Sequence, residues 1–262
     1  MQKRKSTILS KEVTMCPVVI KKILQPFFIF SFLFSIFCFL AISSTPAQAQ
    51  SLEWERTWGG AGVSYNFEEV VIDDDGNTYA ASYRHIVQTQ PDGSDGWETD
   101  TGFSPIRDLY IAGNYLYVTG DIPGSITAKK YNLSGNYIET YTYDYPVFTT
   151  DRPVGIAADA STGNVYVCGY AYNPTASSVK HWLVLKFVPG NPAPDVPPVV
   201  NQGGGEARQP KDIDLDSTGV YVGGSYSSPY VPMLIKYRLT DLGELWDKDY
   251  GSISRVYRLH CH

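Results

Sequence analysis

Apolar and polar residues alternate in short runs through most of the chain after residue 50. In the stretch 211–216, KDIDLD, the apolar residues Ile213 and Leu215 stand between aspartates. A period of two residues places successive side chains on opposite faces of a β-strand, so this strand is expected to bury one face. Helical periodicity is absent from the same part of the chain, which is rich in tyrosine and β-branched residues. The pattern predicts an all-β protein.

A short run built around a tyrosine occurs four times along the chain. The copies are GNTYAAS, NYLYVTG, GNVYVCG and TGVYVGG, and their tyrosines are Tyr79, Tyr117, Tyr166 and Tyr221. These tyrosines are 38, 49 and 55 residues apart. An alternating run precedes each copy, and an apolar run, a turn and a strand with a large aromatic residue follow it. Self-similarity at this spacing indicates a repeat architecture.

Each repeat is expected to form four short strands. Residues that tolerate positive φ, such as Asp-Gly-Asn and Ser-Thr-Gly, separate the first two strands, as a tight hairpin requires. Gly169, at the end of a second strand, allows a neighbouring backbone to approach closely. A four-stranded sheet repeated in this way is the blade of a β-propeller. We expect blades at about residues 52–101, 103–145, 151–205 and 208–250, with residues 251–262 starting a further blade.

Three motifs in these repeats resemble the bacterial SBBP-type β-propeller repeat and, more distantly, NHL-type propellers. The first motif is formed by Trp54, Trp58, Gly59 and Gly60. The second is formed by Asp159, Gly163, Asn164, Tyr166, Val167 and Gly169. The third is formed by Lys236, Tyr237, Gly243 and Trp246. The resemblance covers roughly residues 52–251 and implies the propeller fold, but no catalytic residue set belongs to the repeat.

Two segments bear on the number of blades. The stretch 52–58, LEWERTW, has the pattern of a fourth strand, although the last full blade already has one in ELWDKDYG. The final stretch 251–262 has the pattern of a first strand. We therefore expect a truncated chain, with further blades or domains missing on its C-terminal side. The alternative is a four-bladed ring with a short tail.

Residues 1–49 have the features of a Sec-type signal peptide. Six basic residues come first, an apolar segment runs from Phe27 to Ile42, and the small-residue site 47–49, AQA, follows Pro46. We expect cleavage after Ala49, which makes the protein secreted, periplasmic or surface-located, without stable membrane insertion. The alternative is a membrane anchor, because residues 23–42 are just long enough to span a bilayer.

Removal of this segment makes the chain strongly acidic. It takes away six of the 21 basic residues and one of the 27 acidic ones, so 15 basic and 26 acidic residues remain and the net charge is −11. Nucleic acids and anionic membranes require a basic surface, so they are not expected as partners. The expected ligand is an unknown protein or carbohydrate. Cys168 lies in an apolar run and is expected to be a buried free thiol.

Several short stretches resemble known ligand sites, but each has a simpler interpretation. The stretches 72–77, IDDDGN, and 214–219, DLDSTG, have some of the oxygen ligands of a calcium loop but lack the complete pattern. The stretch 90–97, QPDGSDGW, lacks two positions of the Asp-box of sialidases. Hairpin turns explain all three. The terminal residues 260–262, HCH, cannot all face one metal ion from a strand.

A lysine recurs on the third strand of three repeats, as Lys130, Lys186 and Lys236. These lysines are expected to form structural salt bridges with a repeating aspartate; the alternative is a groove for an anionic ligand. No catalytic, metal or cofactor-binding residue is assigned. We therefore expect a non-catalytic binding or scaffold module. The alternatives are a fragment of a propeller enzyme, such as a carbohydrate-active hydrolase or lyase, and a structural surface repeat of a larger adhesin-like protein.

Overall fold

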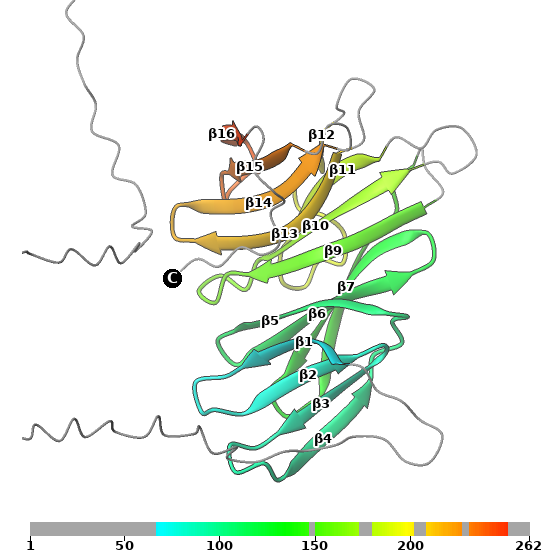
Figure 1. Cartoon of the computed structure of the whole chain (residues 1–262), viewed down its shortest axis with the longest axis vertical. Coiled ribbons are helices and arrows are strands. Elements are labelled where there is room, and N and C mark those ends of the chain that lie inside the picture. The colour runs from blue at the N-terminus through cyan, green and yellow to red at the C-terminus, as the bar shows by residue number, and fades with distance from the viewer. Residues whose placement is uncertain (1–66, 147–149, 173–179, 202–207, 227–230, 251–262) are drawn as a thin grey trace, which may run out of the picture. The chain divides into compact units, whose positions relative to one another are not determined.

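The computed structural model describes residues 67–146, 150–172, 180–201, 208–226 and 231–250, and every element in these ranges is a β-strand. The strands form four antiparallel four-stranded sheets, called blades 1 to 4 in chain order (Figure 1). In each blade, strands that follow one another in the sequence are neighbours. No helix in the described residues is long and apolar enough to cross a membrane.

The strands of blades 1 and 2 are short and joined by tight turns. Blade 1 comprises β1 (Phe67–Ile72), β2 (Thr78–Ser82), β3 (His85–Thr89) and β4 (Asp95–Asp100). Blade 2 comprises β5 (Ile106–Ala112), β6 (Tyr115–Ile122), β7 (Ser125–Asn132) and β8 (Tyr137–Tyr143).

Blades 3 and 4 repeat this order of strands. Blade 3 comprises β9 (Thr150–Ala158), β10 (Val165–Tyr172), β11 (His181–Phe187) and β12 (Val199–Asn201). Blade 4 comprises β13 (Arg208–Asp216), β14 (Gly219–Tyr226), β15 (Pro232–Tyr237) and β16 (Glu244–Asp249). Four four-stranded sheets without a described helix confirm the all-β prediction. The expected spare strand at residues 52–58 and the further blade at 251–262 lie outside the described residues.

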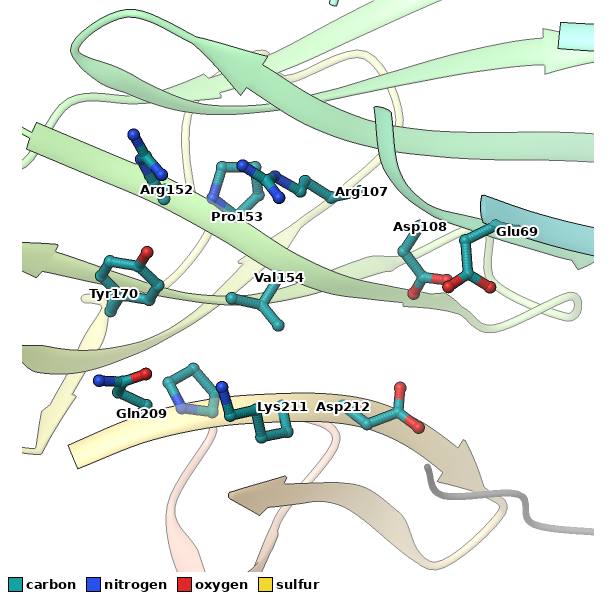
Figure 2. Close-up of a pocket in the computed structure, with 11 residues that line it drawn as sticks. Glu69, Arg107, Asp108, Arg152, Pro153, Val154, Tyr170, Gln209, Lys211 and Asp212 are labelled. Carbon is teal, nitrogen blue, oxygen red and sulfur yellow. The ribbon is translucent and has the colours of Figure 1, made fainter. Parts of the chain in front are cut away.

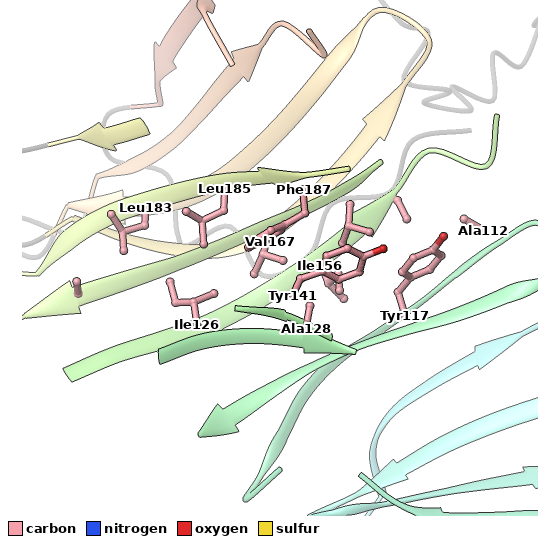
Figure 3. Close-up of a cluster of buried hydrophobic side chains, with 13 residues drawn as sticks. Ala112, Tyr117, Ile126, Ala128, Tyr141, Ile156, Val167, Leu183, Leu185 and Phe187 are labelled. Carbon is pink, nitrogen blue, oxygen red and sulfur yellow. The ribbon is translucent and has the colours of Figure 1, made fainter. Parts of the chain in front are cut away.

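The blades pack face to face in chain order. Strand β5 contacts β1 and β2, β9 contacts β5, β6 and β7, and β13 contacts β9, β10 and β11. Each of the three hydrophobic clusters lies between two consecutive blades. Figure 3 shows the cluster in which blade 2 presents Tyr117, Ile126 and Tyr141 to the aliphatic face of blade 3. The core of the protein is therefore a series of interfaces between blades, and no blade buries its apolar faces by itself.

Two of the repeated tyrosines contact the turn between the third and fourth strands of the next blade. The Tyr166 hydroxyl of blade 3 donates a hydrogen bond to the main-chain oxygen of Leu239 in blade 4, at 2.9 Å. In blade 1, the Tyr79 hydroxyl lies 3.4 Å from the main-chain oxygen of Leu133, which also accepts a hydrogen bond from the Trp97 indole at 2.9 Å. Burial raises the pKa of Tyr166 to about 12. The repeat in the sequence thus reflects a repeated contact between neighbouring sheets.

The fourth strand of blade 3 lies within the proline-rich stretch 188–205, which the sequence suggests is solvent-exposed. Strand β12 has only three residues, and it pairs with β11 from Trp182 to Val184. Val196 and Val199 pack against the cluster between blades 3 and 4, although Pro189 and Gly190 are exposed. The expectation of an exposed insert therefore holds for only part of this segment, because blade 3 needs it to cover β11.

Tyr166→Phe is expected to lower the free energy of unfolding by about 1 kcal/mol, because it removes one hydrogen bond between blades and leaves the ring packing intact. Chemical denaturation of the variant and the wild type gives this difference. Tyr115→Phe is the matched control, since Tyr115 is 39 % exposed and its hydroxyl has no hydrogen-bond partner among the described residues. This change should alter the free energy of unfolding by less than about 0.5 kcal/mol. Equal losses in both variants would show that the Leu239 contact does not hold the blades together.

Candidate functional site

The first strand of every blade contains an extra residue at the same place. The register between the first and second strands skips one residue in each case, so that the strand forms a β-bulge. The bulged residues are Glu68 in β1, Arg107 in β5, Val154 in β9 and Lys211 in β13. A bulge bends its strand and changes the direction of the side chains beside it, which is why bulges are frequent next to binding sites.

The four first strands, near their β-bulges, line a pocket of about 310 Å³ (Figure 2). Its charged residues come from all four first strands: Glu69, Arg107, Asp108, Arg152, Lys211 and Asp212. Pro153, Val154 and Pro210 add apolar surface, and Gln209 and Tyr170 add polar groups. The volume lies at the lower end of the range for small-molecule sites.

Acidic residues occupy one equivalent position in three of the four blades. Glu69, Asp108 and Asp212 each follow the bulged residue, whereas blade 3 has Gly155 at this place. The Asp108 carboxylate accepts hydrogen bonds from the main-chain N–H of Leu109 and of Ile156, both at 2.9 Å. Because Ile156 lies in β9, this carboxylate also joins blade 2 to blade 3.

Asp108 has an unusual protonation equilibrium. Burial raises the pKa of its carboxyl to about 8, and the negative charges of Asp212 and Glu69 act in the same direction. The two main-chain hydrogen bonds oppose this shift, but burial is the largest effect. At neutral pH, Asp108 is therefore mostly protonated, and Glu69 and Asp212 supply the negative charge of the pocket.

The two arginines of the pocket lie apart from Glu69 and Asp108, whereas the basic Lys211 lies next to Asp212 in β13. Figure 2 shows Arg107 and Arg152 on either side of Pro153, and Glu69 and Asp108 beside each other in another part of the pocket. Arg107 donates from Nε and Nη2 to both oxygens of Asp121, at 2.9 and 2.6 Å, and this hydrogen bonding raises its pKa. That pair holds the guanidinium in one orientation and does not occupy its Nη1 donors.

Arg152 differs from Arg107 in its partners. Its side chain is exposed, and no residue in the described ranges forms an ion pair or hydrogen bond with its guanidinium. Tyr170 lines the pocket in the same region, and its ring packs against Tyr172, with 6.1 Å between the ring centroids. Lys180 lies over the Tyr170 ring at 4.4 Å. This region is therefore positively charged and has an aromatic surface.

The residues that define the sequence repeat do not line this pocket. Tyr79, Tyr117 and Tyr166 are buried between blades, and Tyr221 packs against Trp246 with a centroid distance of 6.1 Å. Asp159 accepts hydrogen bonds within its own hairpin turn, from the Ser161 N–H and the Thr162 hydroxyl. Trp54, Trp58, Gly59 and Gly60 lie outside the described residues.

The lysines of the third strands have structural partners. Lys186 pairs with Asp195 at 3.0 Å and donates to the main-chain oxygen of Thr240 in blade 4. Lys130 lies 3.6 Å from Glu139. Lys236 instead donates to the Tyr221 hydroxyl at 2.7 Å. Salt bridges explain two of the three lysines, but their partners are not one repeating aspartate.

In the expected hairpin turns, aspartate side chains stabilise the turn by accepting hydrogen bonds from main-chain N–H groups. Asp73 accepts from the main-chain N–H groups of Asp75 and Asn77. Partial burial opposes ionisation of its carboxyl, but hydrogen bonds from the Asn77 and Tyr79 side chains, together with the main-chain ones, lower its pKa. Asp216 accepts from the main-chain N–H groups of Thr218 and Gly219. Within the described ranges, no group of three or more His, Cys, Asp or Glu side chains is arranged to hold a metal ion. Cys168 is buried and forms no disulfide, as the sequence predicts.

Comparison with known proteins identifies the architecture. No family model and no curated protein matches the sequence. The propeller of Dos1 is structurally similar, with a TM-score of 0.50, 9 % identity and coverage of 71 % of this chain and 47 % of that structure. The fold is a β-propeller.

A second similar structure has no known function. It is a protein from Bacteroides caccae, with a TM-score of 0.51, 14 % identity and coverage of 74 % of this chain and 64 % of that protein. The present propeller spans less than two thirds of both structures. At these identities the similarity establishes the fold alone, and the resemblance to the SBBP repeat rests on the sequence motifs.

The sequence alone did not reveal the pocket residues of the propeller. Residues such as Glu69, Arg107 and Lys211 stand at polar positions of alternating strands, where solvent exposure is the usual interpretation. One signal is present in the sequence: when the repeats are aligned, the charged pairs Glu68-Glu69, Arg107-Asp108 and Lys211-Asp212 occur at the same point before an apolar run. Such repeated charges at the start of a first strand indicate residues that converge in a propeller.

Proposed function

We propose that the chain is a secreted or cell-surface β-propeller that binds a ligand in the pocket between its first strands and does not itself catalyse a reaction. The observation that carries this proposal is the convergence of charged side chains from all four blades on one pocket. Secretion is supported by the basic, apolar and small-residue segments of residues 1–49. The ligand is a carbohydrate or protein segment small enough to place one unit in about 310 Å³.

A binding role agrees with the hydrogen bonds that the buried Asp108 carboxyl accepts. Both oxygens of Asp108 accept main-chain hydrogen bonds, and one of these bonds joins two blades. A group used in this way supports the wall of a pocket and is poorly placed to transfer a proton to a ligand. The functional groups for binding are then the more accessible residues Arg152, Glu69 and Lys211.

The alternative of a carbohydrate-active hydrolase has one observation in its favour. A carboxyl that stays protonated near neutral pH beside carboxylates is a feature of glycosidase sites, and the pKa of Asp108, about 8, meets this condition. An enzyme would cleave a bound oligosaccharide, whereas a binding module would release it unchanged. Mass spectrometry of the saccharide after incubation with the protein distinguishes the two functions.

A ligand screen combined with pocket variants tests the proposed function. The mature protein is screened against arrays of oligosaccharides and peptides, and every ligand found is titrated by calorimetry against the wild type and two variants. Arg152→Ala is expected to weaken binding at least about tenfold, because one charge-assisted hydrogen bond is worth about 1.5–3 kcal/mol.

The control for this screen is Arg84→Ala, which removes the same charge from an exposed pair with Asp100 in blade 1. Its affinity should equal that of the wild type. If every ligand found binds Arg152→Ala as tightly as it binds Arg84→Ala and the wild type, the pocket is not the binding site and the proposed function is wrong.

A further inference from the structure

Blade 1 exposes apolar side chains on the face that the later blades bury against their neighbours. In blade 2, Leu109 and Ile111 of β5 pack against blade 1, and Leu109 is only 3 % exposed. Val70 and Ile72 hold the same positions in β1, on either side of the residue that pairs with the repeated tyrosine. Both are exposed, Ile72 to 65 %. This face of blade 1 is therefore open to solvent.

Blade 4 leaves the opposite face open, together with a hydrogen-bond donor. In blade 1, the Trp97 ring packs against Tyr79 at 5.8 Å between centroids, and its indole donates to the main-chain oxygen of Leu133 in blade 2. Trp246 holds the same position in β16 and packs against Tyr221 at 6.1 Å. Trp246 is 41 % exposed, and its indole N–H has no hydrogen-bond partner among the described residues. Blade 4 thus has the donor of the contact between blades without its acceptor.

Blade 1 has the matching acceptor. In blade 2, Leu133 follows Asn132, whose main-chain N–H and oxygen close the turn between β7 and β8. Gln90 closes the turn between β3 and β4 with the same two main-chain hydrogen bonds, so Pro91 stands where Leu133 stands in blade 2. Pro91 is exposed, and its main-chain oxygen accepts no hydrogen bond from the described residues. Proline lacks an N–H group but keeps this acceptor.

The apolar part of the blade 4 face is also incomplete. Leu234 in β15 pairs with its second strand at the register of Ile86 in β3. Ile86 is fully buried in the cluster between blades 1 and 2, whereas Leu234 is only partly buried. The open faces of blades 4 and 1 are therefore the two halves of the interface that joins consecutive blades elsewhere in the chain.

These two faces do not meet within one chain. Val70, Ile72, Pro91 and Trp246 are all exposed, and Figure 1 shows blades 1 and 4 at opposite ends of the series of blades. A face that exposes apolar side chains beside an unused hydrogen-bonding group is typical of a protein–protein interface. Because one chain carries both halves, a second copy of the same chain fits each of them.

We propose that blade 4 of one copy binds blade 1 of a second copy, head to tail, through the contacts that join consecutive blades. Trp246 then donates to the main-chain oxygen of Pro91, and Val70 and Ile72 are covered by the sheet of blade 4. Two copies can form this contact twice, since each has both faces, and a reciprocal contact closes a ring instead of extending a filament. The inference goes beyond the proposed function, because it concerns assembly and not ligand binding.

Sedimentation equilibrium of the mature protein tests the association, and the expected mass is that of two chains. Ile72→Asp places a charge in the contact and should weaken association at least about tenfold. Ile138→Asp is the matched control, because it makes the same change at an isoleucine of β8 that is 42 % exposed and lies on neither open face. It should associate as the wild type does. Far-ultraviolet circular dichroism confirms that each variant is folded.

A second variant shows whether the contact is head to tail. Trp246→Ala removes the donor and the ring from the blade 4 face, and it should also weaken association at least about tenfold. A mixture of Ile72→Asp and Trp246→Ala should associate more tightly than either variant alone, because the intact blade 4 face of the first fits the intact blade 1 face of the second. A monomeric wild type, wild-type association in either variant, or a mixture no tighter than its components would overturn the proposal.

Discussion

A protein with valine in place of Gly169 is expected to be unfolded at 25 °C. Gly169 lies in β10 opposite the bulge of β9, and a Cβ atom there would be 2.4 Å from the main-chain oxygen of Arg152 and 2.9 Å from the Ile126 side chain. The first of these neighbours is backbone, so it cannot rotate away. Relief of the clash requires separation of β9 from β10, which opens the interfaces of blade 3 with both neighbours.

Alanine at the same position gives a graded version of this test. Gly169→Ala is expected to lower the free energy of unfolding by about 3 kcal/mol, because a single methyl group already overlaps the Arg152 carbonyl. Urea denaturation followed by far-ultraviolet circular dichroism measures both variants.

Gly243→Ala is the matched control for this series. Its nearest neighbour would be the end of the exposed Arg238 side chain, at 2.7 Å, which can move into solvent. The control should lose less than about 1 kcal/mol. A folded Gly169→Val protein with wild-type stability would show that β9 and β10 do not approach as closely as the structure indicates.

Stability should fall as the pH rises from about 4 to 8, the reverse of the behaviour of many proteins. In the folded state, burial raises the pKa of Asp108 to about 8 and that of Asp151 to about 6. In the unfolded state both carboxyls return to ordinary values near 3.8. The folded state therefore holds protons that the unfolded state has released, and each such group lowers the free energy of unfolding by up to about 1.4 kcal/mol per pH unit.

Other aspartates limit this trend at acidic pH. Hydrogen bonds lower the pKa of Asp73, Asp159 and Asp216 in the folded state. These three groups stabilise the folded state fully when the pH is above their unfolded pKa, and this stabilisation is lost on acidification. The two effects together place maximum stability near pH 4–5. Denaturation curves between pH 3 and pH 9 locate this maximum.

The variant Asp108→Asn tests whether Asp108 causes the loss of stability between pH 6 and 8. The variant cannot titrate, so its stability should change little between pH 6 and 8, where the wild type loses stability. It should be less stable than the wild type near pH 5, because the amide can accept only one of the two main-chain hydrogen bonds. Asp74→Asn, in an exposed turn position, should follow the wild-type profile. A wild-type stability that increases from pH 5 to 8 would contradict the assignment.

The fold could be predicted because its signals are local and repeated. Alternation marks the strands, glycine and aspartate mark the turns, and each copy of the tyrosine run confirms the others. A fourth strand was expected in blade 3, but the position of β12 was not predicted, because three residues, Val199–Asn201, are too few to show a period and lie in a proline-rich stretch. Its pairing with β11 depends on contacts that the local sequence does not contain.

The pocket was harder to predict than the strands. Whether Glu69 or Arg107 faces solvent or a pocket depends on the bulge, and the bulge depends on the residues across the strand pair. Gly120, Gly169 and Gly224 occupy that opposite strand, and a Cβ at any of the three would lie within 2.7 Å of a neighbouring atom. The sequence did indicate a close backbone approach at Gly169. It did not indicate which charged groups this approach would bring together.

The contacts of Tyr166 and Trp97 with their neighbouring blades have a consequence for how such a chain evolves. Both side chains donate to main-chain oxygens, of Leu239 and Leu133 respectively, and every residue type has such an oxygen. The receiving turn can therefore change its side chains without loss of the bond. When a whole blade is duplicated or recombined, these two hydrogen bonds therefore place no condition on the side chains of the receiving turn, whereas the hydrophobic clusters between blades still require side chains that fit each other.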